Sequence, residues 1–542
     1  MGDPVGMALK GDCRGFLHYF AGRPAKELLD YRTANGDSAF HIAEAMEDPQ
    51  LIQQFLERLT PDTRLEALKQ TDAFGNNGLH EAAVVEDFAV ARVLVDFSRK
   101  SVDAHENLLR VRNGWGETPV YRAAALGKTK VLQILTEQFC DSSYHFHREK
   151  DDMTILHMAV LGQHFETAIW LLNHDSSLAE KRATVVEKRA TLKSDELSST
   201  SDKLKSFTCL ELLALMPAAF KSADDMKEMK SPFHYRLPTC LDDDYNYKED
   251  IETDKIDNRS GHTKKRRGCS WIEEIWKEKK MHEDAVALVK RLVEIERLNP
   301  YSNPQKAETT EQEISETRKQ GISETRKRDI SGTTKEEIFT ICLGFGKGSD
   351  ILGKKLVDFS AEELIEVLRI KDGTNDAVED GKNATTDDRT LHFAASNGIT
   401  EIMQEMLQQD PQALLSNVNE LTEQNILHVA VERRQHKVFE FIMKEMQLYV
   451  PKWAAEIDKY GYTLLHNVAD MKHYKQGTRS GPVLQFQEEL QWFERVKEIM
   501  PRHFVMHRDE KKNITASDLF DLTHEDQLRK VLCAECGIKC TK

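Results

Sequence analysis

The stretch TILHMAVLGQHFETAIWLL, residues 154–172, decides the fold because its pattern returns many times along the chain. Its histidine, His157, follows an apolar pair and stands two positions before the small residue Ala159. A histidine at the start of a helix is compatible with three roles: a catalytic base, a metal ligand, or a structural residue that meets no ligand. The rest of the chain distinguishes between these roles.

Eight further segments align with this stretch at the position of His157, which we call the key position. The nine key residues are His41, His80, Tyr121, His157, Glu211, His392, His428, His466 and Asp518. Neighbouring key positions lie 36 to 41 residues apart in five intervals, and longer intervals precede Glu211, His392 and Asp518. A period of this length indicates stacked repeats rather than one globular core.

Each repeat carries helix-start and turn signals around its key position. Eight of the nine residues three positions earlier are Ser, Thr or Asn, which cap helix N-termini, and Arg389 is the exception. Five positions before the key residue, glycines predict turns with positive φ. These glycines are Gly36, Gly75, Gly116 and Gly461. An amphipathic segment such as FETAIWLL then predicts a second helix in each unit.

This unit resembles the ankyrin repeat, a β-turn followed by two antiparallel helices with the signature Thr-Pro-Leu-His-x-Ala. The resemblance implies an all-α ankyrin-repeat solenoid, with helix-turn-helix repeats and β-turns, in two blocks joined by a flexible linker. It also implies that the recurring histidines bond turn backbone and connect successive units. A catalytic base is needed once, whereas histidine occupies six key positions, so we interpret His157 as structural.

The order of repeats and polar tracts predicts the domain organisation. The predicted parts are 1–172, N-terminal ankyrin repeats with a helical cap; 173–206, a polar insertion; 207–298, a fifth repeat with a charged loop and an amphipathic helix; 299–335, a disordered linker; 336–532, a C-terminal ankyrin block; and 533–542, a cysteine-containing tail. The linker repeats an eight-residue tract from Ile314, Ile322 and Ile330 that is too polar to bury a core.

Two long amphipathic segments outside the repeat pattern predict further core residues. In the first, helical spacing selects Ile272, Ile275, Trp276, Ala285, Leu288, Val289 and Leu292. In the second, the core candidates are Leu484, Leu490, Trp492, Phe493 and Val496.

Three short motifs suggest other chemistry and are weak on inspection. LGFGKGSD, residues 343–350, lacks the Ser or Thr that a phosphate loop requires after Lys347. CAECGIKC, residues 533–540, offers three cysteines where structural zinc usually takes four ligands, with His524 as a distant fourth candidate. KKRR, residues 264–267, fits a nuclear-localisation patch or a solvated loop, and we favour the loop. We predict no catalytic, cofactor-binding or metal-binding residues, no cofactor, and no enzymatic activity.

Composition restricts the class of partner and the compartment. The 542 residues carry a formal net charge of −16, which disfavours non-specific binding to nucleic acid. Nine scattered cysteines, an odd number, are no disulfide framework and indicate a reducing compartment. No run of about 18 apolar residues occurs, so we expect no membrane span in this chain. We therefore expect a cytoplasmic protein.

A finer resemblance comes from the order of LLALMPAAFKS, AVALVKRLVEI, NILHVAVERRQHKVFEFI, DKYGYTLLH and QEELQWFERVKEIMPRHF. It is to the plant ankyrin-repeat proteins of the PGG-domain family, which are linked to defence and salt-stress signalling. The resemblance implies a non-enzymatic scaffold for protein–protein interaction, with protein partners. The alternative is a membrane-associated signalling component of that family whose transmembrane anchor is absent from this chain. Such a component would reach the plasma membrane peripherally, through membrane-anchored relatives.

Overall fold

The computed structural model describes residues 3–33, 36–84, 88–99, 108–137, 143–148, 153–187, 203–223, 270–298, 386–409, 411, 422–472, 481–509 and 512–536. The chain forms two compact units, which are described separately: Met1–Leu212 with Glu294–Asp372, and Leu213–Val293 with Gly373–Lys542. The predicted linker, the LGFGKGSD and KKRR segments, and Cys540 lie outside the described residues.

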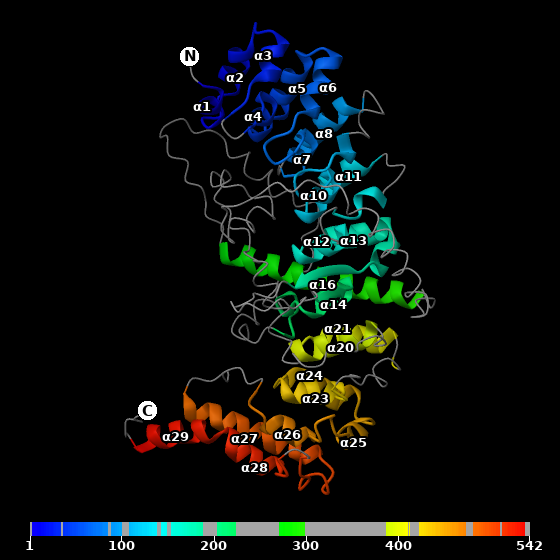
Figure 1. Ribbon diagram of the computed structural model, residues 1–542, viewed down its shortest axis with the longest axis vertical. Helices are drawn as coiled ribbons and strands as arrows, with labels where there is room; N and C mark the ends of the chain where they lie inside the picture. The colour runs from blue at the N-terminus through cyan, green and yellow to red at the C-terminus, as the bar shows by residue number, and fades with distance from the viewer. Residues whose placement is uncertain are drawn as a thin grey trace, which may run out of the picture. The chain divides into compact units, whose positions relative to one another are not determined.

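The first unit is a succession of short helical hairpins (Figure 1). Its helices are α1 Pro4–Ala8, α2 Cys13–Phe20, α3 Ala25–Asp30, α4 Ala39–Ala45, α5 Pro49–Glu57, α6 Pro61–Lys69, α7 Gly78–Ala82, α8 Phe88–Ser98, α10 Pro119–Ala125, α11 Thr129–Thr136, α12 Ile155–Leu161 and α13 Phe165–His174. In each repeat an inner helix carries the key residue and an outer helix follows it. Helices α2 and α3 occupy the region where the sequence predicts a helical cap.

The helix-start signals of the sequence act as predicted. Thr154 Oγ1 accepts a hydrogen bond from His157 N–H at 3.2 Å, which satisfies one of the unpaired donors at the start of α12. The inner helices are capped by Ser38, Asn77, Thr118, Thr154, Asn425, Thr463 and Thr515. All four predicted turn glycines have positive φ, from 77° to 87°. The predicted cap residues at these seven helices and the predicted turn glycines are therefore confirmed.

A second left-handed position follows the inner helices and lacks glycine in several copies. Six residues after the key position, φ is 53° at Glu47, 68° at Gly127, 58° at Gln163, 79° at Gly398 and 54° at Arg434. This conformation ends the inner helix and turns the chain toward the antiparallel outer helix. A residue with a side chain is strained there by about 1–3 kcal/mol, so it persists only where neighbouring contacts hold it.

One β-hairpin interrupts the helical pattern of the first unit. Strand β1, Ala183–Glu187, pairs antiparallel with β2, Lys203–Phe207, so that Ala183 lies opposite Phe207. The β-branched run at residues 184–186 favours an extended backbone. Apart from Phe207, both strands belong to the predicted polar insertion, whose two ends thus form regular structure.

The second unit repeats the helical-hairpin arrangement (Figure 1). Its helices are α20 Thr386–Asn397, α21 Thr400–Gln409, α23 Ile426–Glu432, α24 His436–Glu445, α25 Val450–Trp453, α26 Leu464–Ala469, α27 Pro482–Ile499, α28 Ala516–Thr523 and α29 Glu525–Cys536. Two helices extend across the division between the units: α14 Cys209–Ala214 and α16 Ser270–Leu298. Helix α20 begins at Thr386, so Arg389, the one poor cap residue, lies inside it.

Within the second unit, the end of the fifth repeat contacts the repeat of His392. Ser222 N donates to Glu401 Oε1 at 2.9 Å, and the Ser222 hydroxyl bonds Gly398 O at 3.1 Å and the Glu401 carboxylate. Asn397 Nδ2 donates to Ala214 O at 2.7 Å. The repeat pattern therefore resumes in space beside the point where the sequence leaves it.

The core of the two long helices is only partly as predicted. Ala285, Leu288, Val289 and Leu292 of α16 are buried, as are Trp492, Phe493 and Val496 of α27. The prediction that Leu484 and Leu490 belong to the core is wrong, because these side chains are 41% and 44% exposed. Glu489, only 4% exposed, shares the inward face of α27 with Trp492, Phe493 and Val496, and Leu490 lies off that face.

Candidate interaction surface

The recurring histidines connect each repeat to the next. His157 Nε2 lies 3.0 Å from the carbonyl oxygen of Phe207. The same bond joins His41 to Asn76, His80 to Glu117, His392 to Gln424 and His466 to Ile514. The acceptor always lies four residues before the next key position. The predicted role is confirmed at these five histidines, whereas His428 lies near the backbone of Glu456 instead.

Burial lowers the pKa of five of the key histidines, which favours the neutral imidazole at His41, His80, His157, His428 and His466. It lowers the pKa of His80 to about 3, and those of His157 and His428 to about 4. At His157, Nδ1 lies 2.6 Å from the Thr154 hydroxyl, which can donate to it, and Nε2 then carries the proton that bonds the next repeat. Both nitrogens of His157 are thus engaged with protein, which leaves neither for a substrate or a metal.

The key residues that are not histidine follow the same chemistry. The Tyr121 hydroxyl donates to Met153 O at 3.1 Å, and Met153 again stands four residues before the next key position. Glu211 and Asp518 only accept: each carboxylate takes the backbone N–H of its cap residue, Thr208 or Thr515. A carboxylate has no proton to donate onward. The two copies stand before the longest gap in the repeat pattern and at its last copy, and neither carboxylate can donate a bond to a following repeat.

The turns before the inner helices form rigid fingers, which we define as residues 72–76, 113–117 and 458–462. In the first, Asp72 Oδ1 accepts from the N–H groups of Phe74 and Asn76, both at 2.8 Å. Asn113 and Asp458 make the same pair of bonds in the other two fingers. Side-chain acceptors that mimic a backbone turn fix the conformation of each fingertip.

Each finger carries an aromatic residue at the same tip position. These residues are Phe74, Trp115 and Tyr460, which are 38%, 7% and 36% exposed. The Phe74 and Trp115 rings stack with centroids 5.5 Å apart, and Gly114 N donates to Phe74 O at 2.6 Å. A Cβ on Gly114 would lie 2.7 Å from that oxygen, so glycine is required for the two fingers to approach. The result is a half-exposed aromatic platform on a fixed backbone.

A polar ladder runs beneath the two N-terminal fingers. Asn113 Nδ2 donates to Asn76 Oδ1 at 3.0 Å and to Glu117 Oε2 at 3.3 Å. Arg122 and Arg148 then pair with the Glu117 carboxylate at 3.7 and 3.3 Å. The bond between Asn113 and Asn76 joins the two fingers, and the Glu117 carboxylate pairs with both arginines.

Three further carboxyl groups gather beside this ladder, and we call them the acidic recess: Glu44, Asp72 and Glu81. Glu44 is 1% exposed, and neither of its oxygens has a hydrogen-bond partner among the described residues. Burial, reinforced by Glu81 and Asp72, raises the pKa of Glu44 well above its ordinary value. Burial also raises the pKa of Glu81 to about 7, although Arg122 opposes the shift.

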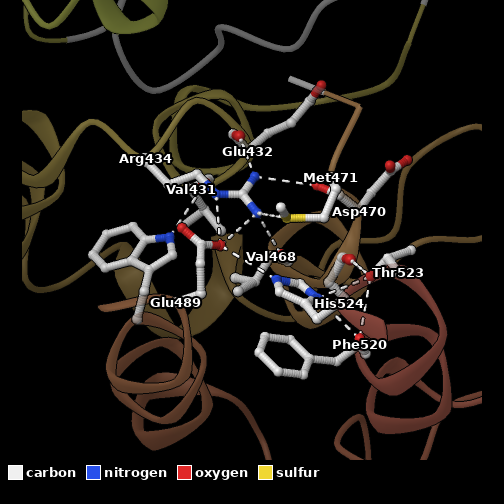
Figure 2. A network of polar contacts seen from close by, with 12 residues as sticks. Val431, Glu432, Arg434, Val468, Asp470, Met471, Glu489, Phe520, Thr523 and His524 are labelled. Carbon is white, nitrogen blue, oxygen red and sulfur yellow. Dashed lines mark hydrogen bonds and ion pairs between the residues drawn. The ribbon is translucent and has the colours of Figure 1, made fainter. Parts of the chain in front are cut away.

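The second unit has a different polar cluster, centred on Arg434 (Figure 2). Its guanidinium donates to the carbonyl oxygens of Glu432, Val468 and Asp470 at 2.8, 2.7 and 3.2 Å. It also bonds Glu489 Oε2 through Nε at 3.2 Å and Nη2 at 2.9 Å. Arg434 therefore ties the ends of α23 and α26 to α27, and these bonds hold its left-handed backbone.

His524, the residue that follows α28, lies beside Glu489 as a second candidate for a positive charge (Figure 2). His524 Nε2 lies 3.6 Å from Glu489 Oε2, and the imidazole stacks on Phe520 at 3.8 Å between ring centroids. Burial raises the pKa of Glu489, but the nearby His524 and the bonds from Arg434 outweigh burial and hold this pKa below its ordinary value. A histidine–carboxylate pair also occurs in catalytic triads, but Glu489 and His524 are 4% and 1% exposed here, and the Thr523 hydroxyl donates to Ala469 O at 2.6 Å. The cluster is a structural brace.

Sequence reasoning did not find the acidic recess or the Arg434 cluster. Arg434 occupies a turn position where glycine stands in other copies, and Glu489 interrupts an apolar stripe. Those two irregularities are the signals that could have found the cluster. Within the described ranges, no group of three or more His, Cys, Asp or Glu residues is arranged to hold a metal ion. Cys533 and Cys536 lie in α29, and the rest of the CAECGIKC motif after residue 536 lies outside those ranges.

Comparison with known proteins agrees with the repeat geometry. A family model described as ankyrin repeats in three copies matches residues 79–182. Among solved structures, the ankyrin-repeat domain of Bcl-3, a member of the IkappaB protein family, is 19% identical and covers 32% of this chain and 72% of its own, with a TM-score of 0.26. No curated protein matches the chain. The repeat geometry and the match to the family model define the fold as an ankyrin-repeat solenoid, and the finer resemblance to plant PGG-domain proteins stays a prediction.

Ankyrin repeats generally mediate protein–protein interaction, and the proteins that carry them are typically not enzymes. No helix in the described part of the chain is both long enough and apolar enough to cross a membrane.

Proposed function

We propose that the chain is a scaffold that binds a protein partner on the fingers of its N-terminal repeats. The observation that carries the proposal is the Phe74–Trp115 platform: one ring is 38% exposed, and it stacks on a buried one that the fingers hold in place. Aromatic side chains on rigid backbone supply contact area with little loss of conformational entropy, which is why they dominate protein interfaces. The cellular role in plant stress or defence signalling rests on the sequence resemblance.

Affinity purification from native tissue, with the full chain as bait, tests this proposal. Phe74→Ser should reduce recovery of the major partner at least about tenfold, a loss of about 1.4 kcal/mol. The matched control is Tyr460→Ser, which removes an aromatic of similar exposure from the same tip position of a finger in the second unit. Equal recovery with both variants would refute the N-terminal fingers as the binding face.

The alternative, a membrane-associated component of the PGG-domain family, makes a different prediction. Association through membrane-anchored relatives would leave the chain in the supernatant when it is expressed alone and move it to the membrane fraction when a relative is present. High-speed centrifugation of a detergent-free lysate measures this. Recovery of the chain alone in a carbonate-resistant pellet would contradict both readings.

A further inference from the structure

The acidic recess contains a buried carboxyl group without a partner. Glu44 lies on α4 between two repeats, and neither Oε1 nor Oε2 is hydrogen-bonded to any described residue. The charged side chains that act on it are Glu81 and Asp72, both of its own sign. A buried polar group without a partner costs about 1–3 kcal/mol, so a site that keeps one calls for an explanation.

The position of the Glu44 carboxyl group is fixed by its surroundings. A Cβ on Gly78 would lie 2.8 Å from Glu44 Oε1 and 2.6 Å from the Phe40 ring. The carboxyl group therefore lies over the first turn of α7, the helix that carries Glu81 one turn later. The equivalent residue of the next repeat is Pro119, so glycine at 78 leaves the room in which Glu44 points toward the recess.

The nearest basic side chains do not neutralise the recess. Arg122 pairs with Glu117 at 3.7 Å and lies over the Trp115 ring at 5.7 Å, and Arg148 pairs with Glu117 at 3.3 Å. Glu81 is partly exposed, whereas Glu44 is 1% exposed, so a cation from outside meets Glu81 first and reaches Glu44 only when the side chains around it move. Arg122 acts on Glu81, but the pKa of Glu81 stays raised, so the three carboxyl groups keep the chemistry of a cation-binding site.

We propose that Glu44, Asp72 and Glu81 receive the side chain of a lysine or arginine from the protein partner, while an apolar residue next to it packs on Phe74. Asp72 and Phe74 belong to one finger, so a single short segment can reach both. The proposal rests on the proposed function and names the chemistry of its partner. A basic peptide is favoured over a metal ion because the three carboxyl groups are not arranged as a metal site.

Binding of such a cation releases protons. Burial raises the pKa of both groups, that of Glu81 to about 7, and so favours their protonated forms, whereas a bound ammonium or guanidinium group favours the ionised forms. The other charged and titratable groups that act on the recess or on its neighbour His41 are Arg32, Asp37 and Arg122. Affinity for a basic peptide should therefore rise from about pH 6 to about pH 8.

The probe is a displayed library of random short peptides selected on the full chain, followed by synthetic copies of the selected peptide. One copy keeps its lysine or arginine, and the other has neutral norleucine or citrulline there. We expect enrichment of a basic residue beside an apolar one, and at least about tenfold weaker binding of the neutral copy, which is about 1.4 kcal/mol. The double substitution Glu44→Gln with Glu81→Gln should remove the preference for the basic copy and its pH dependence. Asp96→Asn, at an exposed acid on α8, is the matched control and should change neither.

The outcomes separate the two proposals. Selected peptides without basic residues whose binding depends on Phe74 would overturn the recess and leave the finger surface standing. Binding of basic peptides that survives the double Gln substitution would also overturn the recess. If binding of basic peptides requires Glu44 and Glu81 but is unchanged by Phe74→Ser, the recess is supported and the aromatic platform is rejected as a binding surface. A selection that enriches nothing on this face counts against both.

Discussion

The two units bury a glutamate in opposite ways. Glu44 of the first unit has no hydrogen-bond partner among the described residues, whereas Glu489 of the second meets Arg434 and His524 (Figure 2). Burial acts on both, yet the pKa of Glu44 is raised and that of Glu489 is lowered. Burial alone therefore does not determine the charge of a carboxyl group; the partners available to it do.

The difference also separates a brace from a binding site. Glu489 accepts two bonds from Arg434, which also donates to Val468 O of α26, and removing either charged partner leaves an uncompensated buried charge. Glu44 has no such task in the described structure, because its carboxyl group joins nothing. A stability defect is the expected signature of changes at the first site, and a change in pH dependence is the expected signature at the second.

The largest expected effect comes from breaking the brace. Arg434→Met should lower the free energy of unfolding of the second unit by about 3–5 kcal/mol, because Glu489 is left charged and buried. The left-handed backbone at residue 434 also loses the bonds that hold it. Hydrogen exchange of α26 and α27 measures the loss locally, which suits a repeat array whose unfolding need not be two-state.

A double substitution sharpens this prediction. Glu489→Leu with Arg434→Met removes both charges, and the pair should recover most of the loss, since replacing a buried ion pair by apolar residues is often neutral. Lys444→Ala, at an exposed pair with Glu445, serves as the surface control and should change stability by less than about 1 kcal/mol. Equal losses in the single and double variants would mean that Arg434 acts through packing and not through charge.

The next effect is on pH dependence in the first unit. A carboxyl group with a raised pKa holds a proton in the folded state, so the stability it contributes is present below about pH 4.5 and is lost as pH rises through the folded pKa. For Glu81 that window runs from about 4.5 to about 7. Relative to the parent chain, Glu44→Gln with Glu81→Gln should therefore gain about 1–3 kcal/mol between about pH 5 and about pH 7.5.

Comparing the two chains at each pH is essential, because the buried histidines act in the opposite direction. The lowered pKa values of His80 and His157 make the parent chain less stable as pH falls below about 6.5, and this contribution cancels in the difference. Denaturant unfolding at a series of pH values gives the difference directly. A difference that stays constant with pH would show that Glu44 and Glu81 titrate normally and that the recess is not buried in solution.

A smaller loss is expected when a repeat-to-repeat bond is removed. His157→Ala should destabilise the first unit by about 1–2 kcal/mol, because Phe207 O loses its donor and Thr154 its partner. Protection of the α12 and α13 amides against hydrogen exchange reports it. Unchanged protection would contradict the structural role of the key histidines.

The sequence predicts the repeats well because their signals are local. A cap residue, a turn glycine and an apolar period act within one unit, so they can be recognised without the fold, and Ser38 and Gly36 illustrate this. The prediction for Leu484 and Leu490 fails in α27, where Glu489 lies on the buried face and its partners Arg434 and His524 lie 55 and 35 residues away in sequence. Periodicity alone assigns a glutamate to the surface.

The candidate site depends on contacts of the same non-local kind. Nothing in the sequence around Glu44 shows that Gly78, in the next repeat, makes room for its carboxyl group. The effect of Glu211 and Asp518 at their key positions, by contrast, can be predicted from the sequence, since a carboxylate cannot donate to a following repeat. The interaction class is thus predictable from the repeats, whereas the acidic recess required the structure.

The smallest expected effect comes from the repeat link that the Tyr121 hydroxyl makes. Tyr121→Phe removes the bond to Met153 O but keeps the buried ring, so no cavity forms. Met153 O also accepts from Arg148 N–H at 3.2 Å, so it does not become an unpaired buried acceptor of the kind that Glu44 presents. We therefore expect a loss of about 0.5–1 kcal/mol, the net value of a hydrogen bond, and less than for His157→Ala. Fluorescence of the nearby Trp115 during denaturation measures it, and a loss above about 2 kcal/mol would show that the hydroxyl, and not the ring, holds these two repeats together.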